Sequence, residues 1–301
     1  MTDAAPALST LNYVNLGAFL LNVLFTYGVG VNGLFGLPDN TVLSEKYQTL
    51  VTPIGWAFSI WGPIFISEGI YAVVQMLPKY RADPMVTQGV SYYYAATCLA
   101  QIFWTFSFSL EVNWLACTLM FSILACLIGL VRSQYKLATE SAGKFWLLQF
   151  PFQLHLGWII AASNVNLSVL LVAYGSDNSE LQLSVGILSL SAVVAVALYV
   201  LFVLEKRLVT TAGVQAWALG GIAAQLKYPF EKTVVEFGQL VLDGVGGAAA
   251  IASTILAIIV GLNIVYEIYL TASGKGPECV KDDKNKLPMT LEAPLTGVST
   301  V

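Results

Sequence analysis

The sequence predicts an all-α integral membrane protein with about eight transmembrane helices. Hydrophobic residues make up 57% of the 301 residues and charged residues only 11%, whereas an ordinary soluble domain is about 25% charged. The apolar segments are as long as the roughly 20 residues that a bilayer requires. Their pattern is that of helices and differs from the alternating strands of a barrel, so each segment can satisfy its own backbone.

Eight segments carry this pattern. Within them the only full charges are Glu68 and, close to an end, Glu267. The seventh segment departs most from the pattern, because it is short and rich in glycine, alanine and glutamine. In chain order the segments are 11–36, 52–77, 92–110, 112–131, 145–173, 181–204, 208–226 and 244–272.

Breaks in the apolar pattern divide the chain into four parts. The stretch "GSDNSE" follows the fifth segment and is the clearest internal boundary. The opening "MTDAAPALST" has no basic residue, so it does not resemble the start of a signal peptide. The final stretch is polar and is expected to be disordered. The expected parts are a short N-terminal segment (1–10), a five-helix membrane core (11–176), a three-helix membrane extension (177–272) and a disordered polar tail (273–301).

Basic residues are distributed unevenly between the two sides of the predicted membrane. With eight helices and a cytoplasmic N-terminus, the cytoplasmic side holds all of the 14 lysines and arginines except Lys46, Lys227 and Lys232. This bias follows the positive-inside rule and predicts that both termini are cytoplasmic. The eight predicted helices make the protein a multi-pass membrane protein, and the sequence does not indicate which cellular membrane it occupies.

The charges and motifs argue against several function classes. The net charge of −4 is too small and too dispersed to indicate a nucleic-acid partner. No nucleophile–base pair, metal cluster or cofactor motif is visible, so we expect no enzyme activity, no catalytic residue and no metal site. Membrane lipid and a small lipophilic ligand are the expected partners, and a homodimer is a candidate assembly.

Three predicted helices each place aromatic and hydrogen-bonding residues on one face, at the i, i+3, i+4 and i+7 spacing of a helix. Hydrocarbon does not accept polar groups cheaply, so these faces should point into the bundle or a wet cavity. Aromatic walls with a few polar groups are typical of a pocket for a flat, largely apolar ligand. The candidate ligand-binding residues are Trp61, Phe65 and Glu68 in the second segment, Gln101, Trp104 and Phe108 in the third, and Pro151, His155, Trp158 and Asn166 in the fifth.

Several of these residues also fit other roles. Trp56 is a further pocket candidate, but like other tryptophans near helix ends it also suits an interfacial belt. Gln101 and Asn166 could form hydrogen bonds between helices. His155, the only histidine, suits either a hydrogen-bonded core position or an axial haem ligand. Glu68 is the least compatible with packing alone, and we expect it to be protonated or paired with His155.

At these residues the sequence resembles the TspO/MBR family, also known as the tryptophan-rich sensory proteins, translocator proteins or peripheral-type benzodiazepine receptors. "WGPIFISEG" resembles the family pattern W-x-x-x-[YF]-x-x-x-G, and "AQIFWTFSF" is similar to LNxxWxxxFF. "PFQLHLGWIIAASNVN" resembles PYxxWxxFAxxLN, with His155 at the tryptophan position. The resemblance covers about residues 11–173, and "TPIGWAFSIWG" looks closest to a longer branch of the family with extra C-terminal helices.

The resemblance implies a TspO-like five-helix bundle plus about three additional helices. It also implies a pocket for a tetrapyrrole, either porphyrin or haem, or for a sterol-like lipophile, used in sensing, sequestration or transport, with no required cofactor. In such a pocket a porphyrin would stack on Trp61, Trp104 and Trp158. Glu68 departs from the short family pattern and keeps an alternative open, a proton-coupled secondary transporter of a small solute in which Glu68 carries the proton.

Overall fold

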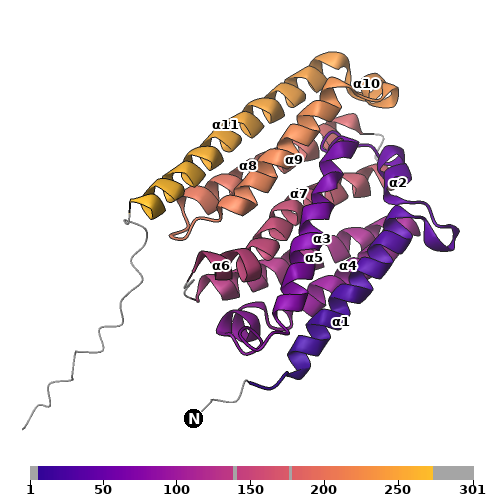
Figure 1. Cartoon of the computed structure of the whole chain (residues 1–301). Coiled ribbons are helices and arrows are strands. Elements are labelled where there is room, and N and C mark those ends of the chain that lie inside the picture. The colour runs from indigo at the N-terminus through magenta and orange to yellow at the C-terminus, as the bar shows by residue number, and fades with distance from the viewer. Residues whose placement is uncertain (1–5, 138–140, 176–177, 274–301) are drawn as a thin grey trace, which may run out of the picture. The chain divides into compact units, whose positions relative to one another are not determined.

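The computed structural model describes residues 6–137, 141–175 and 178–273, and all regular structure in these ranges is helical (Figure 1). The predicted all-α class is therefore confirmed. Of the expected N-terminal segment the structure describes residues 6–10, the last of which begins α1, and of the expected tail it describes Ser273, which directly follows α11. The rest of the expected disordered tail, beyond Ser273, lies outside the described residues.

Each of the eight predicted segments contains a helix of the structure. Several segments include a short π-helix or 3₁₀-helix next to the main α-helix, and four small elements lie in the connections. The segments correspond to α1 (Thr10–Phe25) with η1 (Thr26–Val31), η3 (Gly55–Ile60) with α3 (Trp61–Val74), α4 (Tyr93–Ser109), α5 (Asn113–Tyr135), α6 (Ala142–Lys144) and η5 (Phe145–Gln149) with α7 (Phe150–Ala173), α8 (Ser179–Phe202), α9 (Val209–Lys227) and α11 (Gln239–Ala272). The connections contain η2 (Leu34–Gly36), α2 (Asn40–Lys46), η4 (Met85–Val90) and α10 (Glu231–Phe237).

Six helical segments are long and apolar enough to cross a membrane, judged by length and composition within the described residues. They are Thr10–Val31, Gly55–Val74, Asn113–Tyr135, Ala142–Ala173, Ser179–Phe202 and Gln239–Leu270. The protein is thus a multi-pass integral membrane protein. The two remaining predicted spans are α4, with 17 residues, and α9, whose sequence is more polar.

Both α4 and α9 carry polar side chains that are buried inside the protein. α4 buries Thr97, Gln101 and Thr105, and α9 buries Thr211 and Gln215. A helix that turns much of its surface toward other helices can carry such groups at membrane depth, because partners within the protein replace the missing water. The total of eight spans and the cytoplasmic position of both termini stay predictions.

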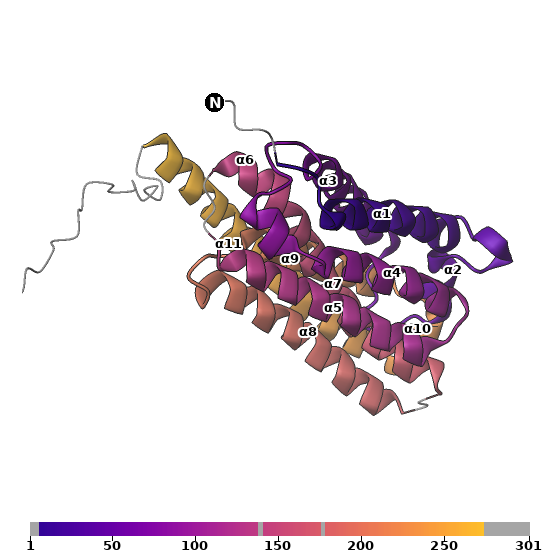
Figure 2. The same ribbon diagram turned by 90° about the horizontal axis from the view of Figure 1, so that it is seen from below.

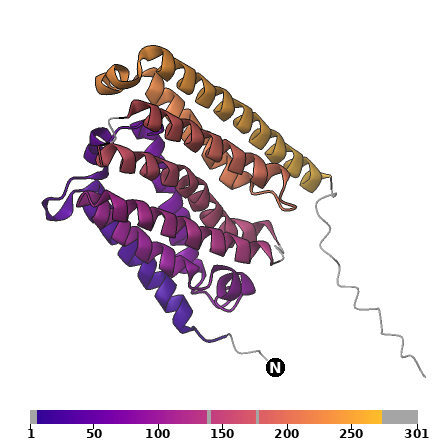
Figure 3. The same ribbon diagram turned by 180° about the vertical axis from the view of Figure 1, so that it is seen from behind.

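Helix α7 lies at the centre of the helical packing. It packs against α3, α5, α8 and α9, and α4 packs against α1 and α5. In the view of Figure 2, α1 and α3 lie at one side of this bundle and α8 at the other. Figures 1 and 3 show α8 and α9 running beside each other along α7.

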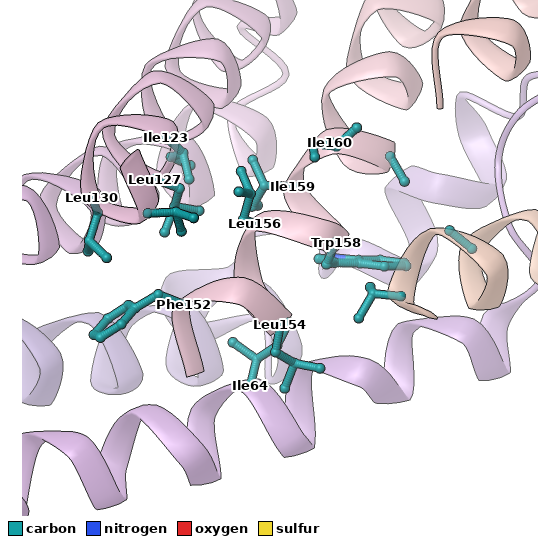
Figure 4. Close-up of a cluster of buried hydrophobic side chains, with 14 of the residues drawn as sticks. Ile64, Ile123, Leu127, Leu130, Phe152, Leu154, Leu156, Trp158, Ile159 and Ile160 are labelled. Atoms are coloured by element: carbon teal, nitrogen blue, oxygen red, sulfur yellow. The ribbon is translucent and has the colours of Figure 1, made fainter. Parts of the chain in front are cut away.

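The burial pattern of α7 agrees with this central position. Every residue from Pro151 to Ala161 is buried, as expected for a helix with neighbours on all sides. Figure 4 shows the resulting core, in which Phe152 and Leu156 of α7 face Ile123, Leu127 and Leu130 of α5. The core therefore fixes the height and rotation of α7, the helix that carries His155.

A glycine brings the predicted extension into close contact with the predicted core. A Cβ atom added to Gly157 would lie 2.8 Å from the carbonyl oxygen of Thr211 and 2.8 Å from Val214 Cβ, so α9 approaches the backbone of α7. The Thr211 hydroxyl donates to the carbonyl of Gln153 at 3.0 Å. The chain up to Ile264 forms one compact unit, and the residues from Val265 belong to a second one. The expected boundary after residue 176 follows a change in sequence composition. In the structure, the helices on its two sides pack against each other.

Polar contacts show which connections share an end of the bundle. At the end where α1 begins, Lys206 Nζ donates to the carbonyls of Tyr135 and Leu137, and Lys144 pairs with Asp83 at 2.7 Å. At the opposite end, Lys46 pairs with Glu111. The topology predicted from the basic residues places certain loops on the same side of the membrane. The loops that contact one another in the structure are loops predicted to share a side.

The close approach of α7 and α9 generates a first prediction. Gly157→Ala should lower the free energy of unfolding by about 1–3 kcal/mol, because the added methyl group overpacks the α7–α9 contact. Thermal unfolding of the purified protein in detergent would measure the loss. Gly17→Ala is the matched control, since a Cβ there meets nothing within 4 Å, and it should be neutral or slightly stabilising. Equal effects of the two substitutions would contradict the close approach.

A second prediction concerns the ion pair that holds α2. Lys46 and Tyr47 donate to the Glu111 carboxylate and together lower its pKa from the usual value of 4.5. A lowered pKa in the folded state means that this contact stabilises above the usual value and is lost as the pH falls through the lowered one. As the pH falls through that lowered pKa of Glu111, we expect α2 to become more mobile, as measured by a spin label on Val42→Cys. In the Glu111→Gln variant the label should be mobile already at pH 7, and an immobile label there would contradict the role of the pair.

Candidate functional site

A cavity of about 330 Å³ lies at the end of the bundle where α1 and η1 finish. Its walls come from η1, α2, η3 and the first turns of α3, with single contributions from α4, from the end of α9 and from the loop before α10. The volume lies within the range of about 300–1,000 Å³ that ligand pockets occupy. The cavity is therefore large enough to be a site for a small molecule.

Aromatic rings form much of the cavity wall. Trp61 and Phe65 stack on each other with ring centroids 5.5 Å apart, and Tyr27 lies 5.4 Å from Phe65. Two contacts fix the position of Trp104: its indole Nε1 donates to Asn166 Oδ1 at 3.0 Å, and its ring stacks on Phe108. The six aromatic lining residues are Tyr27, Phe58, Trp61, Phe65, Trp104 and Phe230.

The polar part of the wall consists almost entirely of hydroxyl and amide groups. These groups can donate or accept hydrogen bonds without carrying charge. They are Thr26, Asn40, Thr41, Ser44, Gln48, Thr52, Ser59 and Gln225. Glu45 is the one carboxylate among the lining residues, and lysine, arginine and histidine are absent from this set.

The C-terminal part of the chain supports the wall as well as contributing to it. Gln225 and Phe230 line the cavity. The backbone N–H of Ile54 donates to the carbonyl of Gly221 at 3.0 Å, and Trp217 Nε1 donates to the carbonyl of Ala57 at 2.9 Å. These bonds tie η3, which carries Phe58 and Ser59, to α9.

A fully buried polar cluster lies one aromatic ring away from the cavity. His155 Nδ1 and Glu68 Oε1 are 2.7 Å apart, and Tyr94 donates its hydroxyl to Glu68 Oε2 at 3.3 Å. The relative exposure of Glu68, Tyr94 and His155 is 0%. The Trp61 ring, which lines the cavity, meets the His155 ring edge-on with centroids 5.6 Å apart. We call Glu68, His155 and Tyr94 the buried triad.

The triad explains how a carboxyl group is accommodated at membrane depth. A proton shared between Glu68 and His155 leaves the pair neutral as a whole, whether the proton is on oxygen or on nitrogen, and an isolated buried charge is avoided. The expected pairing of Glu68 with His155 is present. His155 Nε2 has no hydrogen-bond partner within the described part of the chain.

The remaining candidate residues do not line the cavity: some pack in the protein interior near its walls, and others lie away from it. Gln101 accepts a hydrogen bond from Asn22 Nδ2 at 3.3 Å, which joins α4 to α1. Trp158 is buried with its ring 5.5 Å from that of Phe58, and Pro151 is buried in the first turn of α7. Trp56 is 47% exposed and packs on Trp217 with centroids 4.7 Å apart, so it lies outside the cavity.

Of the predicted site residues, the structure thus brings Trp61, Phe65 and Trp104 to the cavity and Glu68 with His155 beneath it. Sequence reasoning missed Tyr94, although it precedes Gln101 by seven residues and therefore shares its helix face. It also missed the residues of α2 and Phe230, because connections carry no helical period that could reveal a common face. In the described ranges, no group of three or more His, Cys, Asp or Glu residues could hold a metal ion.

Comparison with known families places these features in context. No curated protein and no solved structure matches the chain. A family model described as "TSPO-like protein" matches residues 12–266. This range runs from α1 into α11 and includes the cavity, the buried triad and the C-terminal helices. The chain belongs to the TSPO-like protein family.

Proposed function

We propose that this TSPO-like membrane protein binds a planar, lipophilic ligand in the aromatic cavity, in order to sense, sequester or move that ligand. A tetrapyrrole or a sterol-like molecule is the class of ligand that fits the family resemblance. The observation that carries the proposal is the wall built by Trp61, Phe65 and Trp104. Flat aromatic surfaces with a few neutral hydrogen-bonding groups favour a flat, mostly apolar molecule.

The supports behind the wall strengthen the proposal. The Trp104 indole is fixed by Asn166 and Phe108, and the Trp61 ring by Phe65, Trp158 and His155. Rings that are already immobile lose little conformational entropy when a ligand stacks on them, so more of the contact energy contributes to affinity. We propose no required cofactor and no chemical change of the ligand.

The binding proposal predicts a loss of affinity when Trp104 is truncated. Trp104→Ala should weaken binding about tenfold or more, since a stacked aromatic contact contributes about 0.5–1.5 kcal/mol beyond its buried area. The purified protein in detergent would be titrated with porphyrins and followed by the absorbance of the bound porphyrin, with sterols added as competitors. Trp146→Ala is the matched control, because Trp146 is exposed and does not line the cavity. Equal losses in both variants would overturn the proposed site.

The buried triad favours a second candidate function, proton-coupled transport of a small solute. Glu68, Tyr94 and His155 come from three different helices, α3, α4 and α7. His155 contacts the Trp61 ring, so a change in the protonation of the triad would act on the cavity wall. Titratable residues at membrane depth are a common feature of proton relays in transporters.

Glu68→Gln separates the two candidates. For a binding protein, the variant should fold and keep nearly the same affinity, because a neutral hydrogen-bonding side chain still faces His155. For a proton-coupled transporter, the same variant should bind ligand but lose pH-dependent uptake. Ligand affinity and uptake into proteoliposomes would be measured for both proteins between pH 5 and 8. Tyr94→Phe serves as the control, since it removes only the longer of the two bonds to Glu68. Strong pH-dependent uptake that disappears in Glu68→Gln would replace the first candidate by the second.

A further inference from the structure

Helix α1 turns its polar residues inward and its large apolar residues outward. Asn12, Asn15 and Asn22 are fully buried, and Thr26 follows at the start of η1. Their spacing in the sequence places them on one face of the helix. At 1.5 Å per residue this face is about 21 Å long, compared with about 30 Å for the hydrocarbon core. We call Asn12, Asn15, Asn22 and Thr26 the polar face of α1. The exposed large apolar residues of the helix are Tyr13, Val14, Leu20, Leu21 and Leu24.

At the end where α1 begins, the polar face meets loops that reach solvent. α1 packs against α3 and α4 (Figure 2). Asn12 Nδ2 donates to the carbonyl of Arg81 at 3.3 Å, and Asn15 Nδ2 donates to the carbonyl of Ser91 at 3.1 Å. Arg81 and Ser91 are both partly exposed. This end of the polar face is therefore one residue away from water.

The buried triad lies at the middle of the polar face. At this level the α1 residue is Phe19, which packs on α3, and the polar groups come from other helices. The Tyr71 hydroxyl of α3 interacts with the Asn15 side chain. The Tyr71 ring meets the Tyr94 ring edge-on with centroids 5.5 Å apart. Tyr71 therefore connects Asn15 to the triad.

Beyond the triad, polar side chains continue to the cavity. Cys98 of α4 interacts with both Tyr94 and Asn22. Asn22 Nδ2 donates to Gln101 Oε1 at 3.3 Å, and the Thr26 hydroxyl donates to Asn22 Oδ1 at 3.1 Å. Thr26 lines the cavity. A series of polar side chains thus joins the first loops to the cavity. This polar seam consists of the polar face of α1, the buried triad, Tyr71, Cys98 and Gln101.

Unpaired polar atoms along the seam indicate that it holds water. Within the residues that the structure describes, four atoms of the seam have no hydrogen-bond partner, although each side chain is at most 1% exposed. Buried groups of this kind are normally satisfied by water, and one buried water forms about three hydrogen bonds. Asn15 and Tyr71 interact and each keeps such an atom, so a water molecule between them satisfies both. The four atoms are Asn15 Oδ1, the Tyr71 hydroxyl oxygen, Gln101 Nε2 and His155 Nε2.

We propose that the polar seam holds water and conducts protons between the membrane side where α1 begins and the cavity, with the buried triad as its central relay. Water and hydroxyl groups both donate and accept hydrogen bonds and so pass protons on, while the amides hold the water in place. The proton shared by Glu68 and His155 leaves on one side and is replaced from the other. The pair stays neutral and one proton has crossed. The inference does not rest on ligand binding in the cavity.

The groups around the triad permit this transfer. Tyr71 and Cys98 are the titratable residues that interact with Tyr94 and Glu68, and both are neutral when protonated. The polar face of α1 contributes only neutral groups. Glu68 is the only Asp, Glu, Lys or Arg among the buried side chains of the described ranges. No second buried charge therefore opposes the entry of a proton, and the relay depends on Glu68.

Proton flux into liposomes tests the proposal with the complete protein and without ligand. The liposomes contain a pH-sensitive dye, and a pH step is applied while valinomycin and equal potassium concentrations hold the membrane potential at zero. Wild-type proteoliposomes should admit protons about tenfold faster than protein-free liposomes, and Glu68→Gln should remove most of this excess. Flux equal to that of protein-free liposomes would overturn the proton path and leave the proposed ligand binding intact.

Tyr71→Phe separates a proton path from a purely structural seam. The variant loses only a hydroxyl that has no hydrogen-bond partner in the described ranges, so a structural role predicts unchanged flux. The proton path predicts a severalfold lower flux at unchanged thermal stability, because the water at Asn15 loses a partner. Tyr199→Phe is the matched control, since Tyr199 is exposed on α8. Equal flux in the two variants would contradict the proposed path.

Asn15→Leu provides a second block. It replaces the amide by apolar carbon and should lower the flux about tenfold, equivalent to a barrier about 1.4 kcal/mol higher. Asn164→Leu is the matched control, because the Asn164 side chain donates to the carbonyl of Ile160 within its own helix. Should Asn15→Leu fail to fold, Tyr71→Phe decides. Wild-type flux in a folded Asn15→Leu variant would overturn the role of the polar face.

Discussion

A polar group at membrane depth has to find its partner within the protein, because hydrocarbon offers none. The structure meets this constraint with pairs that join helices far apart in sequence. Glu68 of α3 and His155 of α7 form the pair with the highest electrostatic demand, since an unpaired charge there would be very unfavourable. Neutral side chains follow the same principle: Asn12 with Gln75, Asn22 with Gln101, and Trp104 with Asn166. Each pair sets the relative height and rotation of two helices, so the positions of α1, α3, α4 and α7 are specified by polar contacts as well as by apolar packing.

The cavity depends on these contacts. Trp61 lies between the buried triad and the cavity, so the position of its ring follows from the position of His155. Trp104 takes its orientation from Asn166. The two aromatic residues that dominate the wall are thereby held by hydrogen-bonded partners that never reach the cavity themselves. This arrangement links the polar interior to the cavity wall, whether the triad is only structural or also carries a proton.

Helical period explains which parts of the site could be predicted from the sequence. Trp61, Phe65 and Glu68 share a face, as do Gln101 and Trp104, and the structure turns both faces inward. The pairing of Glu68 with His155 followed from the high energy of an unpaired charge in a membrane. The walls from α2, η3 and the C-terminal helices could not be predicted in this way, because their positions depend on tertiary contacts such as Trp217 with Ala57. Trp56 shows that a sequence motif can also predict too many site residues. This tryptophan packs on Trp217 of a neighbouring helix and stays outside the cavity.

The two sides of the cavity are held by contacts of different strength. The α3 and α4 side rests on the buried triad and on the Trp104–Asn166 bond, which are shielded from water. The α2 side rests on the buried Leu43 and on polar contacts of Lys46 and Lys232, which are exposed to solvent. Exposed ion pairs contribute little because water and salt screen them. The wall formed by α2 is therefore easier to displace than the aromatic wall. Displacing that side would leave the rings of Trp61 and Trp104 in place, so under the proposed function the surface that recognises the ligand would not have to be rebuilt at each binding event.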